Sequence, residues 1–134
     1  MENTNNFTVT IKEASKELTK RERIMYKDTT EAIPLDVATQ EVFEGEFVTI
    51  NPVGYVVLEI HNENTDDKDY EQFLILDSEG NRYITGSQAF WSSFRNIWDE
   101  MTDNGADFEP FQIRVVRKES KNYKGKSFLK AVLI

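Results

Sequence analysis

Cysteine is absent from the 134 residues, and histidine occurs only once, at position 61. The lack of thiols excludes disulfide bonds, zinc–thiolate sites and cysteine nucleophiles. A single imidazole cannot build a histidine-rich metal site, and serine catalysis of the usual kind would depend on His61 alone. The sequence also contains no glycine-rich phosphate loop, no His-Glu zinc motif and no nucleophile elbow. We therefore expect a protein that is not an enzyme and that uses neither a metal nor another cofactor.

Long apolar runs are also missing. No run approaches the roughly 18 residues that a membrane helix needs, and the opening MENTNNFTVT lacks the basic and apolar regions of a signal peptide. Hydrophobic residues make up 39% of the chain and charged residues 30%, which is typical of a soluble globular protein. The length lies near the commonest domain size. We expect one domain spanning residues 1–134, a cytoplasmic location and no contact with a membrane.

Strand patterns are present in the first two thirds of the chain. Residues 7–11 alternate Phe, Val and Ile with two threonines, the period of a strand with one buried face. Residues 55–61 read YVVLEIH, with apolar residues on both faces of a strand. The runs YEQFLILD and RYIT flank the compact turn Ser-Glu-Gly-Asn at 78–81. The runs 7–11 and 55–61 predict one strand each, and the runs YEQFLILD and RYIT predict a strand–turn–strand unit.

The segment between the first two strands is ambiguous. Ser15 is suited to cap a helix carrying Leu18, Arg21, Glu22 and Met25, but residues 23–27 fit an extended basic strand equally well. Residues 29–46 mix acids, a proline and a glycine with isolated apolar residues, and they predict a long irregular connection in which a short strand or turn is an alternative. The pattern leaves helix and strand open for residues 12–50.

One helix is clearly indicated after residue 87. Ser87 provides an N-cap, Asn104-Gly105 provides a left-handed stop, and an apolar stripe lies between them at helical spacing: Phe90, Phe94, Ile97, Trp98 and Met101. Base stacking by either tryptophan is an alternative, but Trp98 shares the stripe with Phe94 and Met101. We therefore assign Trp98 to the core and leave Trp91 open.

The chain closes with two further strand-like runs, FQIRVVR and SFLKAVLI, around the loop ESKNYKGK, and these predict an antiparallel hairpin. The fold class is therefore mainly β with one prominent α-helix. Allowing for the ambiguity of residues 12–50, we take the order as three strands, a helix and two strands, which matches the OB-fold, a five-stranded barrel with a helix between strands 3 and 4. Barrels of this type hold oligonucleotides on the sheet face and in the loops between strands 1 and 2 and between strands 4 and 5.

Positive charge is scarce in the whole chain but concentrated at one end. The sequence has 24 acids and 16 Lys or Arg, a formal net charge of -8. Residues 111–134 hold seven bases and one acid, a balance of +6, whereas residues 1–110 hold nine bases and 23 acids, a balance of -14. This segregation points to a basic surface on the final hairpin.

The final hairpin combines cations with aromatic rings, the two groups that bind phosphates and stack on unpaired bases. Arg114 has the opposite parity to the apolar residues of its strand and is expected to face outward, while Phe128 and Lys130 share one face of the last strand. If residues 23–27 form a strand, two further cations reach the same groove. The candidate nucleic-acid-binding residues are Arg114, Arg117, Lys118, Lys121, Tyr123, Lys124, Lys126, Phe128 and Lys130, with Arg23 and Lys27 added.

Three stretches carry a family resemblance: KELTKRERIMYKD, YITGSQAFWSSFRNIWDEM and RKESKNYKGKSFLKAVLI. In these the sequence resembles the small single-stranded DNA-binding proteins encoded by phages and mobile elements of low-GC Gram-positive bacteria. The resemblance implies an OB-type barrel that coats exposed strands during DNA replication or recombination.

The expected function is noncatalytic binding of single-stranded DNA, with RNA as an alternative ligand, replication or recombination proteins as partners and homo-oligomers as an option. The rival hypothesis is an acidic interaction protein or inhibitor that occupies the DNA-binding surface of a host protein. Its basis is the charge of -14 on residues 1–110, since a broad negative field imitates a phosphate backbone.

Overall fold

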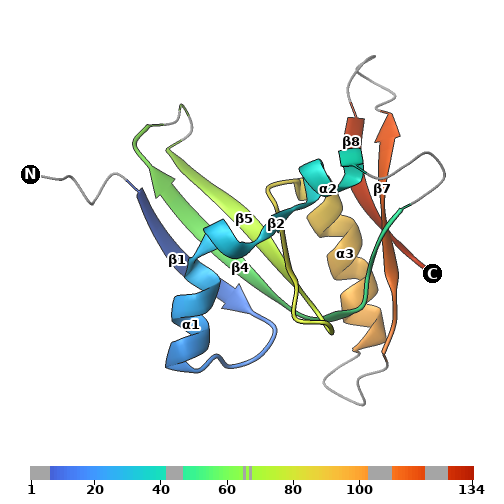
Figure 1. Ribbon diagram of the computed structural model, residues 1–134, viewed down its shortest axis with the longest axis horizontal. Coiled ribbons are helices and arrows are strands. Elements are labelled where there is room, and N and C mark those ends of the chain that lie inside the picture. The colour runs from blue at the N-terminus through green and yellow to red at the C-terminus, as the bar shows by residue number, and fades with distance from the viewer. Residues whose placement is uncertain (1–6, 42–46, 65, 67, 103–109, 120–126) are drawn as a thin grey trace, which may run out of the picture.

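The computed structural model describes residues 7–41, 47–64, 66, 68–102, 110–119 and 127–134. Two β-sheets, one long helix and two short helices make up the fold (Figure 1). The strands are β1 (Phe7–Ala14), β2 (Ile33–Pro34), β3 (Val48–Ile50), β4 (Pro52–Asn62), β5 (Asp69–Asp77), β6 (Arg82–Thr85), β7 (Ile113–Glu119) and β8 (Ser127–Leu133). The helices are α1 (Lys20–Lys27), the 3-10 turn η2 (Thr29–Glu31), α2 (Leu35–Glu41) and α3 (Gln88–Met101).

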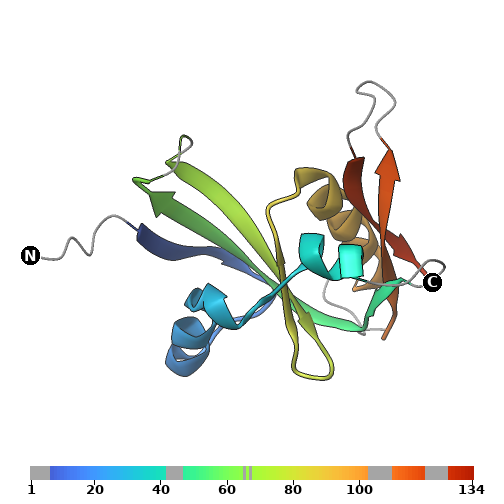
Figure 2. The ribbon, with the colours of Figure 1, turned by 45° about the horizontal axis from the view of Figure 1, so that its top comes forward.

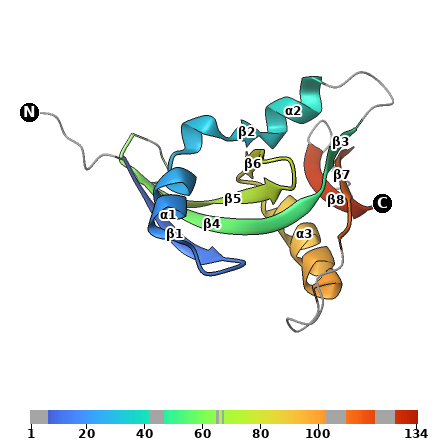
Figure 3. The same cartoon turned by 60° about the horizontal axis from the view of Figure 1, so that its bottom comes forward.

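The two sheets are joined by one bent run of chain. The five-stranded sheet has the order β1-β4-β5-β6-β2, and the three-stranded sheet has the order β3-β7-β8. Every pairing is antiparallel except that of β2 with β6. β3 leads directly into β4, and Figure 3 shows the two as one curved ribbon. At the bend, the Asn51 N–H donates to Oδ2 of the buried Asp77 at 3.0 Å.

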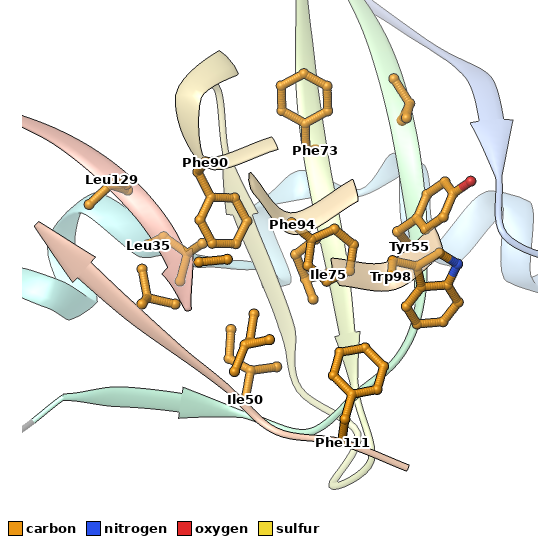
Figure 4. Packing of buried hydrophobic residues seen from close by; sticks show 14 residues of the cluster. Leu35, Ile50, Tyr55, Phe73, Ile75, Phe90, Phe94, Trp98, Phe111 and Leu129 are labelled. Atoms are coloured by element: carbon orange, nitrogen blue, oxygen red, sulfur yellow. The ribbon is translucent and has the colours of Figure 1, made fainter. Parts of the chain in front are cut away.

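The main core lies between α3 and the two sheets. The helix begins at the N-cap Ser87, whose Oγ accepts from the Phe90 N–H, and it buries Phe90, Phe94 and Trp98. Figure 4 shows these rings among side chains from both sheets, including Tyr55 of β4 and Leu129 of β8. Burying apolar surface of this kind stabilises a fold by roughly 25 cal/mol per Å².

A second core covers the opposite face of the five-stranded sheet. Tyr26 of α1 is buried there against Val56 and Leu58 of β4, together with Leu74, Leu76 and Ile84 from β5 and β6. Alternate residues of a strand point to opposite faces, so β4 supplies Tyr55 and Val57 to the main core and Val56 and Leu58 to the second. Both faces of β4 are therefore covered between Tyr55 and Leu58.

Most of the expected strands and the long helix are confirmed. β4, β5, β6 and the β7–β8 hairpin cover the predicted runs, Gly80 adopts a positive φ of 89° in the predicted turn, and Ser87 caps α3. Trp98 is buried in the main core, as its spacing indicated. The predicted helix stop at Asn104-Gly105 lies outside the described residues. In the described part of the chain, no helix has the length and apolar character needed to cross a membrane.

The ambiguous segment folds as a helix, but its cap was predicted wrongly. Thr19 is the N-cap of α1: its hydroxyl accepts from the Glu22 N–H, and Glu22 accepts from the Thr19 N–H in return. Ser15 instead accepts from the Tyr55 N–H at 2.9 Å, beside Gly54, where a Cβ would lie 2.9 Å from the Ser15 hydroxyl. The connection after α1 was predicted to be irregular and contains η2, β2 and α2.

The expectation of a five-stranded barrel requires correction. The structure is mainly β with one long helix, but its strands form two sheets that do not close into a barrel. The predicted first strand is present as β1, which pairs with β4. Two strands lie outside the predicted runs: β2, which pairs with β6, and β3, which follows the connection 29–46 and pairs with β7. Figure 2 shows β2 and α2 beside β6.

Candidate nucleic-acid interface

The outer face of the three-stranded sheet gathers basic and aromatic side chains. In the β7–β8 register, Arg114 lies opposite Val132, Val116 opposite Lys130, and Lys118 opposite Phe128. Alternate neighbours on each strand, such as Val115 and Leu129, are buried in the main core, so these six residues face away from it. Opposed side chains on one face of an antiparallel pair lie about 5 Å apart at Cβ. We call this surface, with Phe47 and Thr49 at its β3 side, the basic sheet face.

Arg114 and Phe47 form its best defined contact. The guanidinium carbon of Arg114 lies 4.6 Å from the centre of the Phe47 ring, a cation–π distance, and Thr49 of β3 is the register partner of Arg114. The Arg114 Nε is buried, and no described residue accepts a hydrogen bond from it. Phe47 itself keeps 46% of its surface exposed. The pair therefore places a cation and an open aromatic ring next to each other.

No described acidic residue pairs with the cations of this face. At the described outward positions of β3, β7 and β8 there is no Asp or Glu, and Arg114, Lys118 and Lys130 form no ion pair with any described residue. Phe128 remains 38% exposed beside Lys118. Cations without local neutralisation attract phosphates, and an exposed ring offers a stacking surface.

Arg117 lies on the other side of β7. Its guanidinium reaches α2, where Nη2 donates to the Thr39 hydroxyl at 3.0 Å and lies 3.7 Å from the Asp36 carboxylate. A further bond from Nη1 reaches the Ser127 hydroxyl at 3.0 Å. Arg117 thus holds α2 against the hairpin and does not contribute to the basic sheet face.

The other predicted site residues fall into two groups. Four of them, Lys121, Tyr123, Lys124 and Lys126, lie in the segment 120–126, outside the described residues. Arg23 and Lys27 lie on α1, because this segment is a helix and not the strand that would have brought them to the same groove. Figure 1 shows α1 and the β7–β8 hairpin at opposite ends of the molecule. The structure brings together Arg114, Lys118, Phe128 and Lys130.

Phe47 was missed by the sequence reasoning. The run Phe47-Val48-Thr49-Ile50 alternates as a strand does, and Ile50 is fully buried while Thr49 faces out. The signal was short and followed directly on a segment read as irregular. The alternation alone would have placed Phe47 on the same face as Thr49.

A pocket of about 380 Å³ on the five-stranded sheet has the opposite charge. It is lined by residues of β1, β4 and β5: Thr8, Thr10, Glu59, Ile60, His61, Asp69, Tyr70 and Glu71. A hydrogen bond to Asp69, and to a smaller extent one to Glu63, raises the pKa of His61. Lys12 pairs with Glu71. Three of the carboxylates in and beside this pocket are thus partly neutralised by neighbouring bases.

No group of three or more metal-ligating side chains gathers among the described residues. Comparison with known proteins found no matching family model, no matching curated protein and no matching solved structure. The candidate site therefore rests on the residues and geometry of this chain.

Proposed function

We propose that the protein binds single-stranded DNA without catalysis, through the basic sheet face. The observation that supports this most directly is the pairing of unneutralised cations with exposed rings: Lys118 beside Phe128, and Arg114 against Phe47. Phosphates bind the cations, and a base stacked on an aromatic ring contributes about 1–3 kcal/mol. Stacking requires unpaired bases, so the face favours a single strand over a duplex.

The strand connections support an open variant of the OB-fold. The run through β3 and β4 pairs with both β7 and β5, as the bent first strand of such a barrel does. β5 pairs with β6, α3 follows, and β7 pairs with β8, which completes the order of three strands, helix and two strands. In this interpretation, pairing of β6 with β8 would close the barrel. Here β2 and α2 lie beside β6 instead of β8.

The position of α1 explains why the proposal uses the hairpin side. In an OB-fold the face of strands 2 and 3 commonly holds the ligand. The corresponding outer face of β5 and β6 is covered here, because Leu74, Leu76 and Ile84 are buried in the second core. The outer surface of β7 and β8 remains open, as the exposure of Phe128 and Lys130 indicates.

The biological setting follows from the sequence resemblance. A protein that coats single strands without reading base identity suits the replication or recombination of a phage or mobile element. Cations and stacking rings contact phosphates and base faces, which carry little sequence information. We therefore expect weak sequence preference. If the protein also binds RNA, we expect RNA to occupy the same face.

The test is fluorescence anisotropy with labelled oligo-dT, alongside a duplex of equal length and oligo-rU. Binding to the single strand should weaken with salt, with a log–log slope of about -2 for three phosphate contacts. Duplex should bind at least about tenfold more weakly, since its bases are not free to stack. Equal binding of duplex and oligo-dT would contradict the stacking part of the proposal.

Variants locate the surface. Lys118→Glu combined with Lys130→Glu should lower oligo-dT affinity by at least about tenfold at low salt, because two phosphate contacts become repulsive. Phe128→Ala should make the free energy of oligo-dT binding less favourable by about 1–3 kcal/mol. The matched control is Lys68→Glu, an exposed lysine whose partner Glu63 lies in the β4–β5 loop. Unchanged affinity in the double variant, with the fold intact by circular dichroism, would refute the proposed surface.

A further inference from the structure

Within the described part of the chain, the unpaired cations lie on two surfaces. Outside the basic sheet face and α1, every described Lys or Arg has an acidic or carbonyl partner: Lys12 with Glu71, Lys16 with Glu22, Lys68 with Glu63, Arg82 with the Met25 carbonyl, Arg95 with Glu13 and Asp99, and Arg117 with Asp36. The four cations of α1, in contrast, pair with no carboxylate among the described residues: Lys20, Arg21, Arg23 and Lys27. In a chain of net charge -8, this second basic surface needs its own explanation.

The exposed face of α1 combines these cations with an aliphatic side chain. At about 100° per residue, Lys20, Arg23, Ile24 and Lys27 fall on one side of the helix. Ile24 is 74% exposed, the largest exposed fraction among the exposed large hydrophobic residues, and Met25 beside it is 45% exposed. A single exposed apolar residue is ordinary, but here it shares one side of the helix with three cations that pair with no described carboxylate.

Contacts with the second core and with Arg82 hold the helix in this orientation. Tyr26, roughly opposite Ile24 on the helix, is buried in the second core, and the Arg82 guanidinium carbon lies 6.0 Å from the Tyr26 ring centre. Arg82 Nη1 also donates to the Met25 carbonyl at 2.7 Å. The capping box of Thr19 and Glu22 fixes the start of the helix. The surface is thus formed before any ligand arrives, which reduces the entropic cost of binding.

The chemistry of α1 differs from that of the basic sheet face. Aromatic rings are the usual stacking platform for unpaired bases, and the one aromatic residue of α1, Tyr26, is buried. An isoleucine instead adds binding free energy by burying an apolar side chain of a partner, while the flanking cations attract carboxylates. The charge and the aliphatic centre complement an acidic segment that carries an apolar residue.

We propose that α1 is a docking surface for an acidic segment of another protein, which packs an apolar side chain against Ile24 and places its carboxylates on Lys20, Arg23 and Lys27. This mode resembles other helix-mediated contacts, in which an apolar anchor gives affinity and the charges give orientation. It assigns α1 a protein partner, separate from the nucleic-acid ligand of the basic sheet face.

The probe is a fluorescein-labelled acidic peptide of about twelve residues, made of Asp and Glu with leucines spaced i, i+4 so that they share one helical face. A second peptide carries serine in place of each leucine. Anisotropy with the full chain at low salt should show several-fold tighter binding of the leucine peptide. Equal binding of the two peptides, or no binding of either, would overturn the proposal.

Two variants separate the contributions. Lys20→Glu combined with Lys27→Glu should weaken both peptides at least about tenfold. Ile24→Ser, at an exposed position that leaves the cores intact, should weaken only the leucine peptide, to the level of the serine peptide. The double variant at Lys118 and Lys130 should leave peptide binding unchanged, and the α1 variants should leave oligo-dT binding unchanged. Loss of oligo-dT binding in the α1 variants would mean that α1 contacts nucleic acid instead.

Discussion

At the scale of single residues, Tyr55 connects three elements of the fold. Its hydroxyl donates to Glu13 of β1 at 2.8 Å, and the guanidinium carbon of Arg95 on α3 lies 4.9 Å from its ring centre. Arg95 also pairs with Glu13 at 3.1 Å. Burial and then the hydrogen bond to Glu13 raise the pKa of Tyr55 from 10.0 to about 12. The phenol is thus held neutral well above its ordinary range.

This shift predicts a loss of stability at high pH. A group whose pKa is higher in the folded state contributes its full stability below the unfolded value, here pH 10, and loses it as pH rises through about 12. Chemical unfolding between pH 9 and pH 12, read by circular dichroism, should therefore show a steeper fall for the wild type than for Tyr55→Phe. Parallel curves for the two proteins would show that Tyr55 does not cause the loss.

At the scale of elements, one serine joins α3 to the edge of the three-stranded sheet. Ser93 Oγ accepts from the Ala131 N–H of β8 at 2.8 Å and donates to the Phe90 carbonyl at 2.8 Å. β8 has β7 on only one side, so this amide points away from the sheet and would otherwise lack a ladder partner. A side chain of α3 thus accepts the hydrogen bond of an amide at the free edge of the three-stranded sheet.

Ser93→Ala should lower the free energy of unfolding by about 1–3 kcal/mol, because the partly buried Ala131 N–H loses its acceptor. Urea denaturation measures this difference. The matched control is the neighbouring Ser92→Ala, since Ser92 is exposed on the same helix and alanine is the better helix former. A loss of similar size in both variants would indicate a general effect of the helix and not the contact with β8.

At the scale of the whole molecule, β4 couples the two cores. Because β4 contributes alternate residues to each core, a change that displaces β4 disrupts the packing of both. Both tryptophans lie on α3 in the main core, so their fluorescence reports on one side of the sheet.

Leu58→Ala, in the second core, should lower the free energy of unfolding by about 2–5 kcal/mol. The transition seen by tryptophan fluorescence should therefore move to a lower denaturant concentration, although both tryptophans lie in the main core. Fluorescence and far-ultraviolet circular dichroism should give one coincident transition. Glu59→Ala, at the adjacent exposed position of β4, is the control and should change little. An unchanged fluorescence midpoint with an earlier change in circular dichroism would mean that the cores unfold separately.

The sequence predicted those elements whose pattern is decided locally. The apolar period of α3 with its cap at Ser87, and the alternation along the final hairpin, are properties of short windows, so they were recognisable. The outward orientation of Arg114 followed from the same parity rule. The capping box at Thr19 and Glu22 was a local signal that was overlooked.

Tertiary pairing decided the rest. Arg117 has the parity of the core residues and reaches α2, an element whose helix depends on burying Leu35 and not on a strong local pattern. The assignment of β4 to two cores, and the covering of β5 and β6 by α1, depend on which segments meet in space. A single window of sequence does not contain that information, so neither the open arrangement of the two sheets nor the position of Arg23 and Lys27 could be derived from it.

The two-sided burial of β4 also bears on how this protein diverges in evolution. From Tyr55 to Leu58 each residue is packed in one core or the other, so the stretch has no solvent-facing position where a polar substitution would be neutral. Exposed loops can change faster under the same selection. Distant relatives should therefore retain a short apolar block at this point after the surrounding sequence has diverged, and that block is where an alignment of them should be anchored.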